Sequence, residues 1–423
     1  MKLTSKGAIK YIKPHYITNN QTIMRKSINK RSSGYILLAV VLAGAVLAGL
    51  IFLGKPLHSE KVSKNESKSF SGNYQNSSDI DLRNSSGVIK EAKAIPVYGN
   101  WHNFTMKDGL PSDKAYTVRI DGDRVLVGTH DGLAVYENEK WHTYTTKDGL
   151  AHNGVVSIDV NELTGDVWIG TLGGLTRWSS GKFTTFNQFN SGLPNDLVYC
   201  VFCDGKDVWT ATGGGAGHYD TQTGLWEIFT EQNAPMHEPW TYGVSAGGGK
   251  VYIAAWGGGM IEYDNTTKRF RDYVDPDGFM EIDLQPDDGI VHDITTATSY
   301  SDSIIWISTY FGMSRYDGKN WKGYFKTDSG LASNFINFLR AEGRVVFVCC
   351  DNGLSSTDGT TWVTYKKDDN SENGKAIITN GNEKKEIPLS PSISHNFIIG
   401  VDAKDDVIWV ATSKGVSRGE MIR

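Results

Sequence analysis

Cysteine is scarce in this chain of 423 residues, which contains four. That number is too small for a disulfide scaffold. Cys200 and Cys203 form a C-x-x-C pair, but they lie in a strand-like segment, where residues three apart point to opposite faces of the sheet. Cys349 and Cys350 are adjacent in a second such segment, and no partner with zinc-site spacing is near. We expect all four to be buried thiols that act as small hydrophobic side chains.

Motifs for cofactors and metal-dependent proteolysis are missing as well. The sequence contains no C-x-x-C-H for covalent haem and no H-E-x-x-H for a zinc protease. The glycine run from Gly213 to Gly217 lacks the G-x-G-x-x-G spacing of a dinucleotide site and is followed by no helical pattern. The sequence therefore predicts no bound cofactor.

Positive charge is in short supply beyond the first 34 residues. The formal net charge is −5, and eight Lys and Arg residues precede residue 35 with no acidic residue among them, so the remainder carries a net charge of −13. An acidic domain repels the phosphate backbone of nucleic acids. We therefore expect no nucleic-acid partner.

The chain has one long apolar run, from Tyr35 to Leu53, and this run has the length that a helix needs to span a bilayer. Basic residues stay on the cytoplasmic side of such a helix. We expect a basic cytoplasmic tail at 1–34, a transmembrane signal-anchor helix at 35–54 and a flexible Ser/Asn/Lys-rich stalk at 55–98. This organisation predicts a single-pass protein of the bacterial inner membrane with a periplasmic or extracellular main domain. A cleaved signal peptide is the alternative.

Residues 99–423 contain an internal repeat, in which an apolar strand ends in a small residue and a Gly and a second strand follow. Examples are RVLVGTHDGLAVYE and DVWIGTLGGLTRWS. The matching residues of the seven copies are Thr129, Thr171, Thr212, Ala255, Thr309, Cys350 and Thr412. The shorter steps are roughly 41 to 43 residues, which is the repeat length of a four-stranded propeller blade.

Two further strand-like pieces flank each copy, so that each unit has four strands, A to D. The seventh copy ends after strand C, and an orphan strand-like piece, Asn100 to Thr105, precedes the first copy. A ring whose last blade is completed by this piece has no exposed sheet edge. The sequence thus predicts an all-β, seven-bladed β-propeller with an N-terminal strand closing the last blade. The residues expected in its core include Trp168, Trp209, Trp306 and Trp409.

Two connections between blades are longer than the others: Asp275 to Val291, and Lys366 to Ser394. Each follows a strand D and precedes a strand A, so both emerge on the same face of the ring. The second is rich in charged and polar residues. We expect it to be a mobile surface loop, with a lid or a partner contact as the functional alternative.

Three stretches carry a family resemblance: Gly149 to Trp178, Gly192 to Asp220 and Ile305 to Trp321. Together they follow the patterns G-L-P-N-D-x-V, D-x-V-W-I-G-T-x-x-G-L and R-Y-D-G-x-x-W. These patterns resemble the two-component regulator propeller repeats found in periplasmic sensor regions of bacterial hybrid histidine kinases and in stand-alone proteins. The resemblance implies a propeller with a sensor-like role, here as a stand-alone, membrane-anchored member.

The turns that lead into strand A lie on the same face as the B to C loops, so the two sets converge around one mouth of the channel. These turns are Ser112-Asp113, His152-Asn153, Asn195-Asp196, His237-Glu238, His292-Asp293, Ser333-Asn334 and His395-Asn396. The second residue is always Asn, Asp or Glu, which favours capping of backbone N–H groups. The four His residues could bind a divalent metal, act as a base or sense pH, with ordinary turn usage as the alternative.

Aromatic residues also occur on this face, where Trp256 and Tyr310 follow strand B and Trp240 precedes a strand A. Such rings suit stacking on a sugar or another flat ligand, and packing between blades is the alternative. The candidate ligand-binding residues at the mouth are therefore His130, His152, His237, Glu238, Trp240, Trp256, His292, Asp293, Tyr310 and His395.

We expect a sensor-like module that binds a ligand or a protein, with a small molecule, a glycan or an envelope protein as its partner. One alternative is a metal-dependent lyase, because the repeat also resembles the propeller of virginiamycin B lyase. That resemblance would imply a divalent metal, elimination at a C–O bond, and roles for the pairs His237-Glu238 and His292-Asp293. A structural scaffold for an envelope complex is a further alternative.

Overall fold

The computed structural model of the protein describes residues 95–275 and 289–422. These residues form strands β1 to β30 and one 3-10 turn, η1 (Met106–Asp108). Within the two described ranges, no helix is long and apolar enough to cross a membrane. The predicted tail, transmembrane helix and most of the predicted stalk lie outside the described residues.

The strands form seven sheets, which are the blades of a β-propeller. Blade one holds β2 (Ala115–Asp121), β3 (Arg124–Thr129), β4 (Gly132–Glu137) and β5 (Lys140–Tyr144). Blade two holds β6 (Val155–Val160), β7 (Val167–Thr171), β8 (Gly174–Ser179) and β9 (Lys182–Phe186). Blade three holds β10 (Val198–Asp204), β11 (Asp207–Thr212), β12 (Gly215–Asp220) and β13 (Trp226–Phe229). Blade four holds β14 (Thr241–Gly247), β15 (Lys250–Ala255), β16 (Gly259–Asp264) and β17 (Arg269–Tyr273).

The remaining three blades follow the same order with one addition. Blade five holds β18 (Thr295–Ser301), β19 (Ile304–Thr309), β20 (Gly312–Tyr316) and β21 (Trp321–Tyr324). Blade six holds β22 (Ile336–Glu342), β23 (Val345–Cys350), β24 (Gly353–Thr357), β25 (Thr361–Lys367), β26 (Gly374–Asn380) and β27 (Glu383–Leu389). Blade seven holds β28 (Ile398–Lys404), β29 (Val407–Thr412), β30 (Gly415–Met421) and β1 (Tyr98–Phe104).

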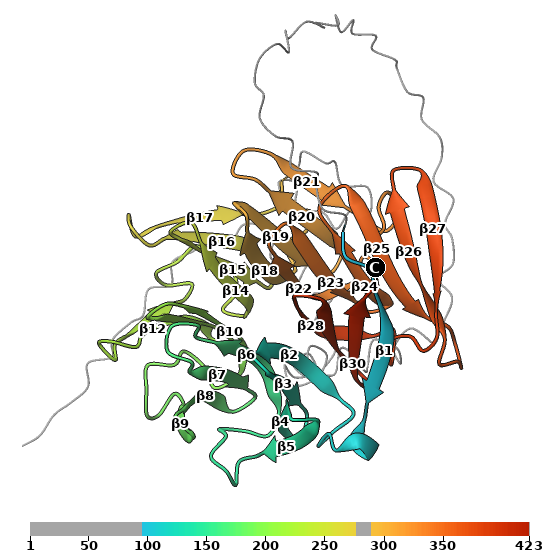
Figure 1. Ribbon diagram of the computed structural model, residues 1–423. Coiled ribbons are helices and arrows are strands. Elements are labelled where there is room, and N and C mark those ends of the chain that lie inside the picture. The colour runs from blue at the N-terminus through green and yellow to red at the C-terminus, as the bar shows by residue number, and fades with distance from the viewer. Residues whose placement is uncertain (1–94, 276–288, 423) are drawn as a thin grey trace, which may run out of the picture. The chain divides into compact units, whose positions relative to one another are not determined.

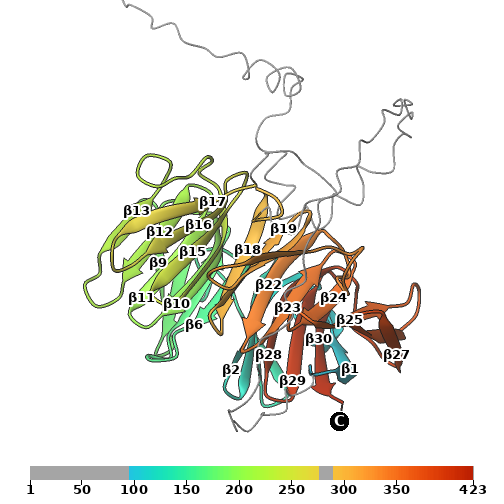
Figure 2. The same ribbon diagram turned by 90° about the horizontal axis from the view of Figure 1, so that it is seen from above.

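The first strand of every blade packs against the first strands of both neighbouring blades, which closes the ring. In Figure 1 these strands, β2, β6, β10, β14, β18, β22 and β28, lie nearest the middle and the later strands lie further out. Figure 2 shows the same blades from above. The predicted number and order of blades are therefore confirmed.

The last blade is completed by the front of the domain, as predicted. Strand β1 runs antiparallel to β30, with Gly99 opposite Glu420 and Phe104 opposite Val416. The backbone N–H of Ile422 donates to the carbonyl of Val97 at 2.7 Å, which adds one more hydrogen bond between the two ends of the domain. Because β1 covers the free edge of β30, blade seven has four strands, as blades one to five do.

The repeated Thr and Gly residues have a structural cause in the B to C turn. In blade one the hydroxyl of Thr129 donates to the carbonyl of Gly132 at 2.9 Å, and blades two, three, five and seven have the equivalent bond. Gly132 has a φ of +147°, and a Cβ there would lie 2.7 Å from the carbonyl oxygen of Tyr144 on the next strand. A residue with a side chain would be strained at this position.

The core lies between blades rather than in one central cluster. Trp168, Trp209 and Trp306 on the second strands are 0 to 1% exposed and Trp409 is 3% exposed, which confirms their prediction as core residues. Trp168, Trp209 and Trp409 each pack on a ring of the next blade; Trp409, for example, lies 5.5 Å from Tyr136 of blade one between ring centroids. All four thiols are free; Cys349 and Cys350 are buried, as expected, whereas Cys200 and Cys203 are half-buried.

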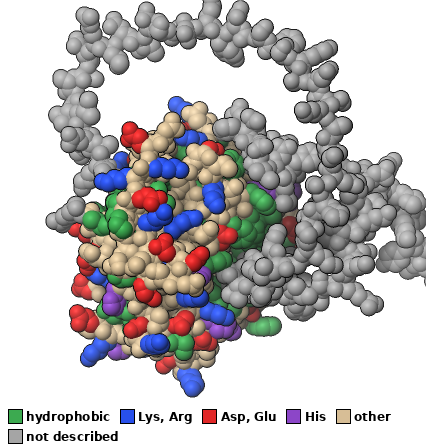
Figure 3. All heavy atoms as spheres, turned by 90° about the vertical axis from the view of Figure 1, so that its right-hand side faces the viewer, with side chains coloured by type: hydrophobic (Ala, Val, Ile, Leu, Met, Phe, Trp, Pro, Cys, Tyr) green, Lys and Arg blue, Asp and Glu red, His purple; other side chains and the backbone are tan. Residues whose placement is uncertain are grey.

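One prediction is wrong. The segment from Lys366 to Ser394 is not a loop, because β26 and β27 form a hairpin that continues the sheet of blade six. Gly374 and Ala376 are buried and alternate with the partly exposed Lys375 and Ile377, which fits a half-buried strand, and Gly381-Asn382 between the two strands is a common two-residue hairpin turn. Figure 3 shows the side of the molecule that carries this hairpin, where basic and acidic side chains are interspersed. The other long connection lies largely in 276–288, outside the described residues.

Candidate functional site

The mouth of the channel is fixed by strand register. In each blade the first residue of strand A pairs with the last residue of strand B, as Ala115 does with Thr129 and Val155 with Thr171. The loops before strand A and after strand B therefore share one face of the ring, which we call the mouth face. The A to B and C to D turns occupy the opposite face.

The recurring Asn and Asp residues of the turns are structural caps, as predicted. Asp113, Asn153, Asp196, Asp293, Asn334 and Asn396 each accept a hydrogen bond from a backbone N–H of the preceding loop, at 2.7 to 2.9 Å. The seventh member, Glu238, is exposed. Asp293 is thus engaged with the backbone of Asp275 and is one of these caps rather than a free acid.

Three of the four His residues at the mouth have the same local role as the Asn and Ser residues in the other blades. The Nδ1 atoms of His152, His292 and His395 accept the backbone N–H two residues further on, at 2.9 to 3.0 Å. Asn195 accepts the equivalent N–H of Leu197 through its side-chain oxygen at 2.9 Å. A nitrogen that accepts a hydrogen bond carries no proton, so these rings present Nε2–H instead.

The structure does not bring the mouth His residues together. His130, His152 and His237 are exposed, whereas His292 is 4% exposed and packs on Phe311 at 4.4 Å. Among residues 95–275 and 289–422, no group of three His, Cys, Asp or Glu side chains could hold a metal ion. The pairs His237-Glu238 and His292-Asp293 therefore form no joint metal site in this part of the chain.

Burial lowers the pKa of two imidazoles at the mouth, those of His292 and His395. Desolvation lowers the pKa of His292, against a smaller opposing effect of Asp293. Desolvation also lowers the pKa of His395, and the charges of Lys414 and Lys367 lower it further. Both rings are therefore neutral at pH 7, as their Nδ1 hydrogen bonds require.

Five aromatic rings form a continuous series across blades three to six on the mouth face. We call this series the aromatic arc. The centroid distances between consecutive rings are 4.8, 5.3, 5.1 and 4.1 Å. In order, the rings are Tyr199, Tyr242, Trp256, Tyr310 and Phe335. Trp256 and Tyr310 were predicted here, while Trp240 contributes its carbonyl, which accepts the N–H of Trp256 at 2.9 Å.

A repeated backbone irregularity places Tyr199 and Tyr242. In all seven blades the register between strands A and B shifts after the first residue of strand A, so the second residue is a bulge. A bulge interrupts the pleat and redirects a side chain. Tyr199 and Tyr242 hold this position in blades three and four, beside Trp256. Sequence reasoning missed both, although aligned A strands would have shown them in one column.

Two polar atoms next to the aromatic arc are buried without a hydrogen-bond partner among the described residues. They are the hydroxyl of Tyr242, which is 9% exposed as a residue, and Oδ1 of Asp351. Asp351 adjoins the arc, because its N–H donates to the carbonyl of Phe335 at 3.2 Å. Desolvation raises the pKa of Tyr199 and of Tyr310 to about 12, and it raises that of Tyr242 with help from these two neighbours. A polar atom that is buried without a partner costs stability, so these two atoms are candidates for contact with a ligand.

His130 lies on the other side of the mouth, away from the aromatic arc. Its Nδ1 is 3.1 Å from the hydroxyl of Tyr116, which holds the bulge position in blade one. The backbone N–H of His130 donates to the carbonyl of Lys114 at 3.0 Å. The predicted residues therefore divide into an aromatic group, a set of turn caps and this separate pair.

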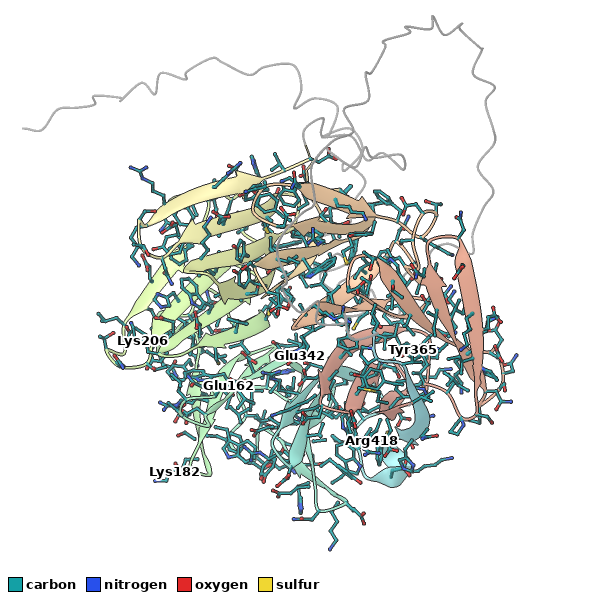
Figure 4. The ribbon with its side chains drawn as sticks, turned by 45° about the horizontal axis from the view of Figure 1, so that its top comes forward. Glu162, Lys182, Lys206, Glu342, Tyr365 and Arg418 are labelled. Atoms are coloured by element: carbon teal, nitrogen blue, oxygen red, sulfur yellow. The ribbon has the colours of Figure 1, made fainter. Side chains whose placement is uncertain are left out.

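A second series, the charged arc, lies on the inner strands of blades six, seven, one and two. Arg340 Nε is 2.8 Å from Asp402 Oδ1, Arg119 Nη1 is 3.2 Å from Asp402 Oδ2, and Arg119 Nε is 3.2 Å from Asp159 Oδ1. The four residues occupy the fifth position of their strands, so charge alternates from blade to blade. In Figure 4 the labels of Glu342 and Glu162 lie close to these inner strands. Sequence reasoning missed this series too.

The carboxylates of the charged arc also satisfy backbone groups of neighbouring blades. Asp402 Oδ2 accepts the N–H of Ile120 at 2.7 Å, and Asp159 Oδ2 accepts that of Cys203 at 2.8 Å. Burial raises the pKa of Asp159 to about 6, and Arg119 opposes that effect. Burial likewise raises the pKa of Asp402. These contacts join the inner strands across blade boundaries.

The letters Gly415-Val416-Ser417-Arg418-Gly419 match the G-x-S-x-G pattern of a hydrolase nucleophile turn, but their structure does not. They lie inside strand β30, and Ser417 is fully buried. Its Oγ accepts the N–H of Ser394 at 2.8 Å. A nucleophile elbow needs an exposed Ser between a strand and a helix, so this motif has no catalytic meaning here.

The fold defines the class of protein: a seven-bladed β-propeller. No protein-family model and no curated protein matches the chain. Among solved structures, the chain is similar to the extracellular domains of two putative hybrid two-component systems from B. thetaiotaomicron, with TM-scores of 0.60 and 0.56, 16% identity to each and 76% of this chain covered. It spans 42% and 40% of those chains. This likeness agrees with the resemblance to two-component regulator propeller repeats and shows the shared fold.

The chain is also similar in fold to virginiamycin B lyase from Staphylococcus aureus. That match has a TM-score of 0.55 and 12% identity, and it covers 76% of this chain and 99% of the lyase. At this identity the likeness concerns the propeller alone.

Proposed function

We propose that the protein is an extracytoplasmic, sensor-like propeller, held at the membrane by its N-terminal apolar run, and that it binds a small ligand on the aromatic arc. The location is supported by the likeness to extracellular domains of two-component systems and by the basic tail before the apolar run. Ligand binding is supported by the arc itself.

One observation carries the binding proposal. The aromatic arc combines contiguous ring surface with two unpaired polar atoms, the Tyr242 hydroxyl and Asp351 Oδ1. A sugar or another flat polar ligand offers an apolar face to the rings and hydroxyl groups to those atoms. The ligand would thereby complete hydrogen bonds that the free protein leaves open.

Thermal unfolding of the full-length chain in the presence of a panel of glycans and small metabolites tests the proposal, because a ligand of the folded state raises the melting temperature. Trp256→Ala should abolish the shift caused by any hit. Leu163→Ala is the control, since Leu163 is 81% exposed on the opposite face. A shift that survives in Trp256→Ala, Tyr310→Ala and Phe335→Ala contradicts binding on the arc.

The two alternatives differ from this proposal in what they require. A lyase shares the propeller, but its metal and His chemistry has no converging set of side chains in residues 95–275 and 289–422. An envelope scaffold would need a partner on the rim of the ring, and co-purification of a protein that survives Trp256→Ala would favour it. Binding on the arc is the function that the geometry supports best.

A further inference from the structure

Successive rings in the middle of the aromatic arc are not coplanar. The plane of Tyr242 is tilted by 53° from that of Trp256, and the plane of Trp256 stands at 89° to that of Tyr310, with ring centroids 5.3 and 5.1 Å apart. A flat ligand stacks on one such ring at a time, whereas a compact group can contact several. The face of an aromatic ring carries negative charge density and attracts cations within about 6 Å of its centroid. The three rings therefore suit a compact cationic group.

Asp351 continues this series in the next blade. Trp256, Tyr310 and Asp351 are the first residues after the second strands of blades four, five and six. In each of these blades the backbone N–H of this residue donates to the carbonyl of the residue before strand A, at 2.9, 3.2 and 3.2 Å. The carboxylate of Asp351 thus holds the position in blade six that the rings of Trp256 and Tyr310 hold in blades four and five.

Asp351 differs from the acidic residues that cap the turns of the mouth face. Asp113, Asp196 and Asp293 each accept a backbone N–H of the preceding loop. In contrast, Oδ1 of Asp351 is buried and accepts no hydrogen bond from the described residues. A buried carboxylate oxygen without a partner has lost hydration and gained no contact in return. A positive charge on a ligand would supply that contact.

Negative charge lies at the blade four end of these rings as well. A Cβ on Gly257, the residue after Trp256, would lie 4.0 Å from Cγ of Glu238, whose side chain is exposed. The nearby positive group at the other end is Lys366. Burial lowers the pKa of Lys366 more than the charge of Asp351 raises it, and no ion pair joins these two side chains within the described ranges. Carboxylates at both ends of the rings favour a cationic ligand.

We propose that Trp256, Tyr310 and Asp351 form a subsite for an organic cation, so that the ligand of the aromatic arc carries a quaternary ammonium or a protonated amine. This inference rests on the proposed function and narrows its ligand class. The ring faces attract the cation and contact its methyl or methylene groups. Asp351 supplies the counter-charge.

The test compares choline with dimethylbutanol, the neutral alcohol in which a carbon atom replaces the nitrogen of choline. The two probes have the same shape and differ in charge, and isothermal titration calorimetry measures their binding to the full-length chain. Choline should bind about tenfold or more tightly than the alcohol. Trp256→Leu keeps apolar volume but removes the ring, so it should weaken choline binding about fivefold and leave the binding of the alcohol nearly unchanged.

A matched pair of carboxylate variants isolates the counter-charge. Asp351→Asn should weaken choline binding about fivefold without affecting the alcohol. The control Asp131→Asn removes the same charge from an exposed position in the B to C loop of blade one, on the same face, and should bind choline normally. Thermal unfolding of each variant confirms that it is folded.

The outcomes separate this inference from the proposed function. No binding of choline, equal binding of the two probes, or equal losses in Asp351→Asn and Asp131→Asn overturns the cation subsite. If the two probes bind equally and Trp256→Ala abolishes the binding of both, the arc is a ligand site without a preference for cations. If choline binds and Trp256→Ala changes nothing, the ligand does not use the arc, which contradicts both proposals.

Discussion

The aromatic arc and the charged arc occupy different parts of the ring: the first lies on the mouth face of blades three to six, and the second lies on the inner strands of blades six, seven, one and two. In the charged arc every charge faces an opposite charge, and its carboxylates satisfy backbone N–H groups of the next blade. In the aromatic arc, the Tyr242 hydroxyl and Asp351 Oδ1 have no partner among the described residues. The charged arc joins neighbouring blades through ion pairs, whereas the aromatic arc offers ring surface to a ligand. The position within strand A decides between them: the second residue faces the mouth and the fifth the neighbouring blade.

Removing Asp402, the central residue of the charged arc, should give the largest change in the free energy of unfolding among the variants considered. Asp402→Ala leaves Arg119 and Arg340 without their shared partner in a buried setting, which should lower the free energy of unfolding by about 3–5 kcal/mol. Chemical denaturation measures this loss. The control Asp317→Asn removes an exposed carboxylate near Arg315 and should cost less than about 1 kcal/mol. Similar losses in both variants would show that the arc holds no blades together.

A smaller, pH-dependent effect should come from Asp159. Because its pKa is raised to about 6 in the folded protein, the folded state holds a proton that the unfolded state releases near its ordinary value. The stability contributed by this group is therefore full below about pH 4 and is lost as pH rises to about 6, a change of about 3 kcal/mol. The difference in unfolding free energy between the natural chain and Asp159→Asn, measured from pH 4 to pH 7, should follow this course. A flat difference contradicts it.

A pair of tyrosine variants sharpens the contrast between satisfied and unsatisfied groups. Tyr242→Phe removes an unpaired buried hydroxyl and should stabilise the unliganded protein by about 1 kcal/mol while weakening ligand binding. Tyr365→Phe removes a hydroxyl that accepts the N–H of Tyr98 at 2.8 Å and should destabilise by about 1 kcal/mol. Figure 4 labels Tyr365. Thermal unfolding of both variants measures the difference, and the same sign in both would refute it.

The smallest effect should come from the turn at the mouth. His395→Asn keeps a side-chain acceptor for the N–H of Phe397, as Asn195 does for Leu197, and should change stability by less than about 0.5 kcal/mol. His395→Ala removes the acceptor and should cost about 1 kcal/mol. A loss of ligand binding in His395→Asn without any loss of stability would assign this ring to the ligand rather than to the turn.

The sequence was sufficient for features that depend on one blade at a time. The number of blades followed from the Thr-x-x-Gly turn, which recurs because its hydroxyl closes the turn onto a glycine carbonyl. The closing strand followed from counting strands at both ends. The Asn and Asp caps followed from the chemistry of turns, and the hydrogen bonds at Asn153 and Asn334 bear this out.

Features that depend on several blades were not predictable in the same way. Trp256 and Tyr310 were found because they follow strand B, but Tyr199, Tyr242 and Phe335 join them only through the curvature of the ring and the bulges. The charged arc consists of residues up to 283 positions apart. The hairpin β26–β27 was missed for another reason. Its outer strand is rich in charged, exposed residues, so the polar composition of the segment favoured the interpretation as a loop.

The strand that closes the ring is made first and used last. During synthesis β1 leaves the ribosome while its partner β30 is still more than 300 residues away, a delay of roughly 15 to 60 s at bacterial rates. During this time Phe104 has Tyr136 and Trp141 of blade one as neighbours, but Trp101 lacks Tyr365 until blade six is made, and the edge of β1 is open to other chains. An open strand edge of this kind exposes the nascent chain to aggregation, and messages truncated near their end should yield proteins that cannot close.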